Sequence, residues 1–139
     1  MLNVIQDLWV ITEGGITVFQ KIHNTQVGDQ LFGMLMSALD SFAHEMSENG
    51  LTGFKMNRLH FNLLRKNGLI FVASSSIKIN QKKIIGELKF VMNQFFENYP
   101  EEKFIDWNGD INIFTDFEQI ICKPKQEYIG DYISKLWGE

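Results

Sequence analysis

The segment LFGMLMSALDSFA, residues 31–43, decides the fold because it carries more apolar surface than one buried helix stripe requires. At about 100° per residue, the apolar side chains of residues 31–46 cover an arc of roughly 200°, about twice what a surface helix uses. The rest of the helix carries a row of small residues, Gly33, Ser37 and Ser41, at spacings of four. Such a row lets another backbone approach closely. The sequence therefore predicts a helix that packs on more than its own sheet.

Length and composition favour one globular domain. The chain has 139 residues, of which 45% are hydrophobic and 22% charged, with a single cysteine and a net charge of −4. Such a charge argues against a nucleic-acid-binding protein, although a local basic patch at Lys82, Lys83 and Lys89 stays open. One cysteine excludes an internal disulfide framework and fits a reducing compartment. No signal peptide or spanning segment is recognisable, so we expect a cytoplasmic protein.

Hydrophobic periodicity and turn residues predict the element order ββαβββα, followed by two short helices. The glycines of TEGG, residues 12–15, and the pair Asn67-Gly68 are typical of hairpin turns. Asn80 is expected to cap the second helix, and Thr115 with Glu118 has the form of a capping box that opens a short helix. The expected strands are residues 3–11, 16–22, 52–57, 59–66 and 69–75, and the two long helices are residues 31–46 and 81–99.

Candidate chemical sites are weak. His23, His44 and His60 share no helix face or ligand spacing, so no metal site is expected. Cys122 has no histidine near it in the sequence, which favours a structural thiol over a nucleophile. The stretch DWNGDIN resembles a calcium loop, but Ile111 stands where that loop needs glycine. We therefore expect no catalytic residue, no metal and no cofactor, and hence no enzyme.

The wide apolar arc of residues 31–46 then has two interpretations. A neighbouring helix of the same chain could cover its second side. Alternatively, the later helices cover one face of the sheet and the first helix covers the other alone, which leaves an exposed apolar surface of the kind that marks an interface. In that case the short third strand would be an open sheet edge.

Taken in order, five segments resemble longin-like domains, particularly archaeal ones: VIQDLWVITEGGITVF, QLFGMLMSALDSFAHEM, HFNLLRKNGLIFVASS, KIIGELKFVMNQFFENY and WNGDINIFTDFEQII. The resemblance covers residues 1–122. It implies an α+β fold of the longin/roadblock (profilin-like) type, related to longin-type SNAREs, adaptor small subunits and the signal recognition particle receptor alpha subunit. In such a fold a five-stranded antiparallel sheet lies between the first helix and the later helices.

The resemblance also implies a non-catalytic role. Longin-like domains bind small GTPases, coat or tether components, or one another, often with first helices and third strands side by side across a dimer. Carried over to this chain, that pairing surface falls on Gly33, Met34, Ser37, Ser41, Phe54 and Met56.

The chain departs from the family pattern after residue 122. Residues 123–139 are expected to form an amphipathic helical extension, Tyr128 to Trp137, and neither SNARE heptads nor a membrane anchor is recognisable. We therefore expect a module that pairs with itself or with a related longin/roadblock-like chain. It would scaffold or regulate a small GTPase or a membrane-trafficking type of complex, and would reach a membrane only through a partner. The alternative is a PAS-like or profilin-like sensor with a small molecule in a closed cavity between sheet and helix.

Overall fold

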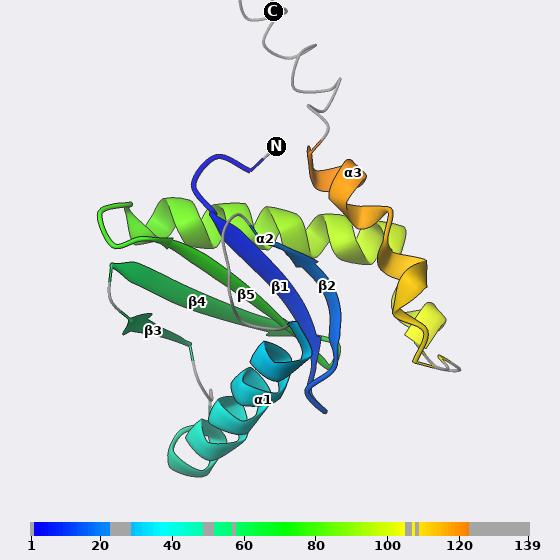
Figure 1. Ribbon diagram of the computed structural model, residues 1–139, viewed down its shortest axis with the longest axis horizontal. Helices are drawn as coiled ribbons and strands as arrows, with labels where there is room; N and C mark the ends of the chain where they lie inside the picture. Colours follow the sequence, from blue (N-terminus) through cyan, green and yellow to red (C-terminus); the bar gives the residue numbers. More distant parts are fainter. Residues whose placement is uncertain are drawn as a thin grey trace, which may run out of the picture.

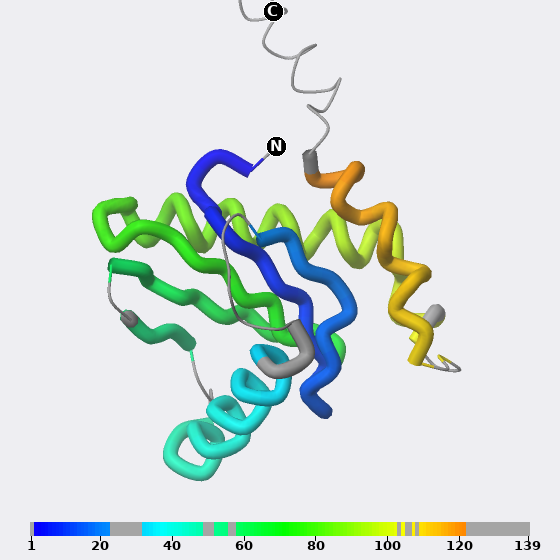
Figure 2. The backbone as a smooth tube through the Cα atoms, in the orientation of Figure 1, coloured from blue at the N-terminus to red at the C-terminus, as the bar shows by residue number. Residues whose placement is uncertain are grey.

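The computed structural model describes residues 2–22, 29–48, 52–56, 58–104, 107 and 109–122. They form a five-stranded sheet in the order β2-β1-β5-β4-β3, in which every neighbouring pair is antiparallel. Helix α1 lies on one face, and α2 lies on the other (Figures 1 and 2). The elements are β1 Asp7–Thr12, β2 Thr17–Lys21, α1 Asp29–Met46, β3 Gly53–Met56, β4 Leu59–Lys66, β5 Leu69–Ser76, α2 Gln81–Asn98, the 3₁₀ turns η1 Glu101–Phe104 and η2 Ile111–Phe114, and α3 Phe117–Cys122. The predicted fold class and the order ββαβββα are confirmed.

Both predicted hairpin turns form. Gly15 has a φ of 95° between β1 and β2, and Asn67 and Gly68 have φ values of 53° and 79° between β4 and β5. Positive φ at two successive residues is the type I′ pattern that suits the twist of a hairpin. The Asn67-Gly68 turn joins β4 to β5 and fixes their register, which runs from Leu59 opposite Ser76 to Lys66 opposite Leu69.

The first strand is shorter than its apolar pattern suggests, because it begins at Asp7 instead of residue 3. The backbone amides of Asn3 and Val4 donate hydrogen bonds to the carboxylate of Glu87 on α2. Residues 3 and 4 therefore bond to the helix layer instead of to a neighbouring strand.

The predicted capping box is wrong. The hydroxyl of Thr115 donates to the carbonyl oxygen of Asn112 at 3.0 Å and so closes the η2 turn. Helix α3 then begins two residues later, at Phe117, and the backbone amides of Gln119 and Ile120 donate to the carbonyl oxygen of Asp116.

Each face of the sheet has its own apolar core. On the α2 side, Phe95 is fully buried and packs against the rings of Phe71, Phe96, Tyr99, Phe104, Phe114 and Phe117. On the α1 side, Trp9 stacks on Phe32 with ring centres 4.1 Å apart, and Phe61 lies next to both. Within the described residues, α1 is thus held by a core of its own, separate from the core that holds α2 and α3.

The predicted cap of α2 is present and gives a first test of stability. The side chain of Asn80 accepts a hydrogen bond of 2.8 Å from the backbone amide of Lys82. Replacing Asn80 by alanine leaves that amide without its partner and should lower the free energy of unfolding by about 1 kcal/mol. Urea denaturation measures this, and Asn80→Asp should retain most of the stability because aspartate caps equally well.

The predicted extension at residues 123–139 lies outside the described residues, as do His23, Asp106 and the side chains of Met56 and Cys122. Among the helices that the structure describes, none combines the length and the apolar character needed to cross a lipid bilayer.

Candidate partner interface

Helix α1 turns most of its apolar arc away from the sheet. The exposed fractions are 62% for Met34, 49% for Leu35, 38% for Leu39, 64% for Phe42 and 76% for Met46. With the exposed Ala38, these residues make up what we call the outer α1 face. Phe42 lies at its centre. Leu35 precedes it by seven residues, Leu39 precedes it by three, and Met46 follows it by four, and these spacings bring side chains to one face of a helix. No element that the structure describes covers this face, so the surplus of apolar surface predicted from the sequence is confirmed.

The opposite face of α1 holds the helix on the sheet. Phe32 is 8% exposed and Met36 is 1% exposed, and both belong to the core that contains Trp9, Phe61 and Val72. Among the apolar side chains of α1, only Phe32 and Met36 thus belong to the described core on this face of the sheet.

Two members of the small-residue row of α1, Gly33 and Ser37, pack against the chain's own β1–β2 turn, whereas Ser41 is exposed. A Cβ atom at Gly33 would lie 2.5 Å from the Thr17 hydroxyl oxygen and 2.6 Å from the Gly15 carbonyl oxygen. A Cβ atom at Gly15 would lie 3.3 Å from the Cα atom of Met34 and 3.4 Å from the Cβ atom of Ser37. The close approach predicted from the row therefore occurs, but the approaching backbone belongs to the same molecule.

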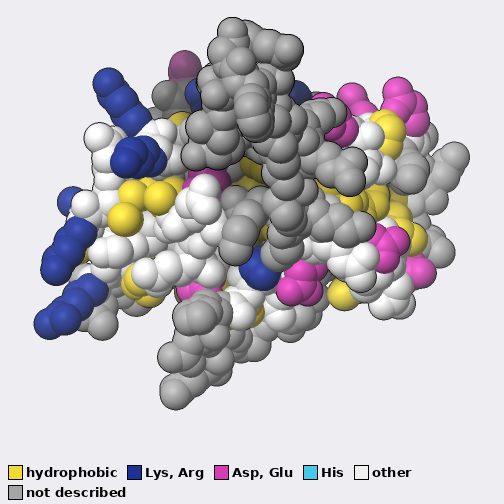
Figure 3. All heavy atoms as spheres, turned by 90° about the horizontal axis from the view of Figure 1, so that it is seen from above, with side chains coloured by type: hydrophobic (Ala, Val, Ile, Leu, Met, Phe, Trp, Pro, Cys, Tyr) yellow, Lys and Arg dark blue, Asp and Glu magenta, His cyan; other side chains and the backbone are white. Residues whose placement is uncertain are grey.

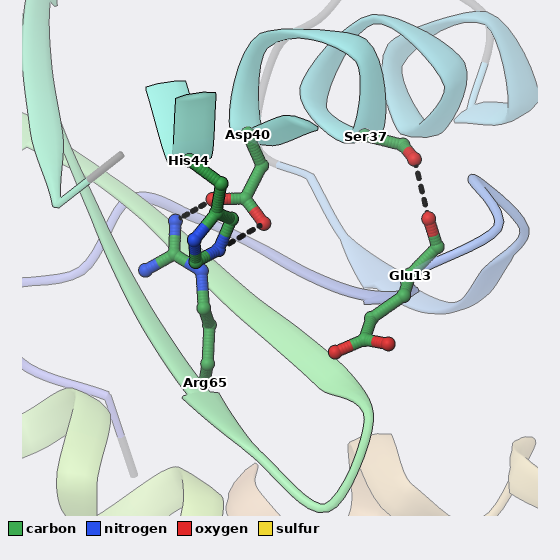
Figure 4. Close-up of polar contacts among 5 residues, drawn as sticks. All are labelled: Glu13, Ser37, Asp40, His44 and Arg65. Atoms are coloured by element: carbon green, nitrogen blue, oxygen red, sulfur yellow. Dashed lines mark hydrogen bonds and ion pairs between the residues drawn. The ribbon is translucent and has the colours of Figure 1, made fainter. Parts of the chain in front are cut away.

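Ser37 adds a hydrogen bond to this contact. Its hydroxyl donates to the carbonyl oxygen of Glu13 at 2.5 Å (Figure 4). Removing the hydroxyl by Ser37→Ala should lower the free energy of unfolding by about 1 kcal/mol. Thermal denaturation measures this change. Because Ser37 bonds within the molecule, sedimentation of Ser37→Ala should give the same mass as the wild type.

A buried ion pair fixes the middle of α1 to β4. The carboxylate of Asp40 bonds to the guanidinium of Arg65, and the imidazole of His44 lies 3.5 Å from the other carboxylate oxygen (Figure 4). Asp40 is only 6% exposed. Truncating one partner of such a pair is costly because the remaining charge stays buried. This pair sets which side of α1 faces the sheet, and thereby which side faces out.

Of the six predicted interface residues, the structure places some on the surface and others inside. Gly33 and Ser37 face the β1–β2 turn, whereas Met34 and Ser41 are exposed on α1. Phe54 is half-buried on β3 and stacks on Phe61 with ring centres 4.7 Å apart. Met56 belongs to β3 through its backbone. The pairing surface carried over from the resemblance is thus split, and its exposed part continues into Leu35, Leu39, Phe42 and Met46, which the transferred pattern did not include.

Strand β3 lies at the edge of the sheet, as predicted, and pairs only with β4 among the described strands. Phe54 projects to the same sheet face as Phe61, which is the α1 side. Phe54 of the edge strand β3 and helix α1 therefore lie on the same face of the sheet (Figure 1).

Two surface hollows bear on the small-molecule alternative. A hollow of about 290 Å³ lies beside β2, between Thr17 to Gln20 and the η2–α3 segment, and opens to solvent. Another, of about 470 Å³, lies on α2 between Gln81 and Lys89 and is also open. A sensor of the predicted kind needs an enclosed cavity between sheet and helix, and neither hollow is enclosed. Within the described residues, no three His, Cys, Asp or Glu side chains lie close enough together to hold a metal ion.

No known family model matches the sequence, and no curated protein matches it. Solved structures do match. Myxococcus xanthus MglB superposes with a TM-score of 0.52 at 10% identity, over 67% of this chain and 77% of that one. The Roadblock/LC7 domain from Streptomyces avermitilis superposes with a TM-score of 0.54 at 8% identity, over 70% and 86% of the two chains. A chain in a homology model of the full-length AP-3 complex gives 0.53 at 14% identity, over 83% of this chain but only 28% of that one.

These matches establish a longin-like fold of the roadblock type, as the sequence resemblance predicted. At such low sequence identity the three matches show the fold alone, because proteins with one fold can have many different functions.

Proposed function

We propose that this longin-like chain is a non-catalytic interaction module that forms a homodimer through the outer α1 face and the β3 edge. The observation that carries the proposal is the exposure of five large apolar side chains along one side of α1. A monomeric protein rarely leaves a continuous apolar surface of this kind in water, and burying it is the usual driving force of association.

A second copy of the chain is the partner that fits best. In a dimer with twofold symmetry the same surface is used by both molecules, so an apolar face meets an apolar face without any further complementarity. On its outer side the edge strand β3 pairs with no other strand among the described residues, so a second β3 can add to it by antiparallel pairing. The closest alternative is a heterodimer in which a related longin-like chain takes the place of the second copy.

The fold supports a regulatory or scaffolding role for the dimer, and the resemblance to longin-like domains suggests that a small GTPase is what it regulates or holds. One of the structural neighbours is a chain of the AP-3 complex, so the fold occurs within a multi-chain assembly. For this chain, the GTPase and a membrane-trafficking type of assembly are proposals. The expected location is cytoplasmic.

Light scattering tests the dimer directly. The chain has a mass of 16.1 kDa, so the purified protein should give about 32 kDa at micromolar concentration. A mass of 16 kDa that does not change with concentration would exclude the homodimer.

Calorimetric titration with small GTPases loaded with GDP or with a GTP analogue tests the further proposal. We expect binding to one nucleotide state to be stronger, with no hydrolysis by the chain alone. Equal or absent binding to every GTPase of the source organism would remove the GTPase role while leaving the dimer untouched.

A further inference from the structure

We infer that the end of the molecule where α2 begins is a binding surface for an anionic lipid bilayer. The first observation is a strong separation of charge along the chain. Residues 49–96 contain eight of the thirteen Lys and Arg residues but one of the seventeen Asp and Glu residues, so this segment carries +7 and the rest of the chain −11. The net charge of −4 is therefore the sum of a strongly basic middle segment and strongly acidic flanking segments.

The fold gathers five of these basic side chains at one end. Lys55 lies opposite His60 on β3 and β4, and the carbonyl oxygen of Arg58 in the β3–β4 turn accepts a hydrogen bond from the amide of Ile77. Residues 76–80 then lead directly into α2. What we call the basic end consists of the exposed side chains Lys55, Arg58, Lys78, Lys82 and Lys83.

Figure 3 shows this polarity on the α2 side of the molecule. Lys and Arg side chains gather at the left, where α2 begins in Figure 1, and Asp and Glu side chains are frequent at the right. A surface with one sign of charge attracts a partner of the opposite sign over about a Debye length, roughly 8–10 Å at physiological salt.

The basic charges lack neutralising partners in the described part of the chain. None of the five side chains forms an ion pair there. The one acidic residue in the segment, Glu87, directs its carboxylate to the backbone amides of Asn3 and Val4. The positive potential of the basic end is therefore available to an external anion.

The start of α2 strengthens the same potential. Its first turn contains Lys82 and Lys83 and no acidic residue. Carboxylates are favourable in the first turn of a helix and cations are unfavourable there, because the backbone dipole places partial positive charge at that end. We therefore expect the two lysines to lower the stability of the isolated protein, while their charges add to the positive potential at the start of α2.

A bilayer explains the composition of this end better than an acidic protein does. Four of the five cations are lysines, which act as hydrated point charges instead of the planar, bidentate groups that arginines offer to individual carboxylates. The exposed Ile77 stands among them, and the open hollow on α2 combines Lys82 and Lys89 with Ile85 and Gly86. Lysines together with isolated apolar side chains are what an anionic lipid–water interface accommodates. The chain would then contact a membrane itself instead of only through a partner.

Sedimentation of the full-length protein with vesicles of phosphatidylcholine containing phosphatidylserine tests the inference. The wild type should bind these vesicles, bind pure phosphatidylcholine vesicles weakly, and dissociate as salt is raised. The double variant Lys82→Glu/Lys83→Glu should lower the partition coefficient at least ~30-fold. Its melting temperature should be unchanged or higher, since glutamate suits the first turn of a helix.

Lys66→Glu is the matched control for Lys82→Glu. Lys66 lies at the far end of β4 from Leu59, roughly 23 Å along the strand, and its ammonium stands over the ring of Phe96. Both variants change the net charge equally, so Lys82→Glu should weaken binding several-fold and Lys66→Glu less than twofold. Three results would overturn the inference: no binding to phosphatidylserine vesicles, equal losses in the two single variants, or tighter binding to polyglutamate than to vesicles, which would assign the basic end to an acidic protein.

Discussion

Substitution of Phe42 by glutamate is expected to halve the solution mass, from about 32 kDa to about 16 kDa. Phe42 is 64% exposed at the centre of the outer α1 face. Burying one such ring in an interface contributes about 2 kcal/mol, and a twofold dimer buries two, so their loss alone should raise the dissociation constant by ~1000-fold. The carboxylates add to this effect because each would have to leave water.

Asn93→Glu is the control for the Phe42 substitution. Asn93 is exposed on α2, on the opposite face of the sheet, and its replacement adds the same charge to a helix surface. This variant should remain a dimer in light scattering. The melting temperature of the Phe42→Glu monomer should report a folded protein, because Phe42 contributes nothing to the two described cores.

Gly33→Ala and Gly86→Ala should change stability in opposite directions. Both glycines lie inside long helices, where alanine usually adds about 0.5–1 kcal/mol. No atom lies within 4 Å of a Cβ placed at Gly86, so that variant should be more stable by this amount. At Gly33 the new Cβ would lie 2.6 Å from the carbonyl oxygen of Gly15, which is backbone and cannot rotate away. We expect Gly33→Ala to lose about 2 kcal/mol.

Urea denaturation of the two variants measures the difference, which should be about 3 kcal/mol. Equal effects of the two substitutions would mean that the β1–β2 turn does not press on α1. In that case the small-residue row would again be available to a partner, as the sequence first suggested.

The elements of this fold were predictable because their signals are local. Alternating apolar residues, the Asn67-Gly68 turn and the Asn80 cap each act over a few residues, and each appears in the structure where the sequence indicates it. The predicted capping box at Thr115 was wrong for a local reason as well, since the Thr115 hydroxyl donates to the Asn112 carbonyl oxygen in the η2 turn and α3 begins only at Phe117.

The orientation of α1 was harder to predict because it depends on contacts between distant residues. In the sequence, Asp40 lies outside the apolar arc of residues 31–46, which favours a position in solvent, but in the structure it is buried against Arg65. A signal for this was present: Arg65 continues the alternation of Leu59, Phe61 and Leu63 and so points to the α1 side of the sheet. A cation on that side requires a carboxylate opposite it. With that pair recognised, the side of α1 that carries Asp40, together with Phe32 and Met36, becomes the inner face.

The rate of methionine oxidation tests most directly whether the outer α1 face is covered by another molecule. In the single chain Met34 is 62% exposed and Met46 is 76% exposed, while Met36, on the inner side of the same helix, is 1% exposed. In the wild type at dimer-forming concentration, dilute peroxide should oxidise Met34 and Met46 several-fold more slowly than in Phe42→Glu, with Met36 slow in both, as peptide mass spectrometry would show. Equal and fast oxidation of Met34 and Met46 in the two proteins would contradict the interface.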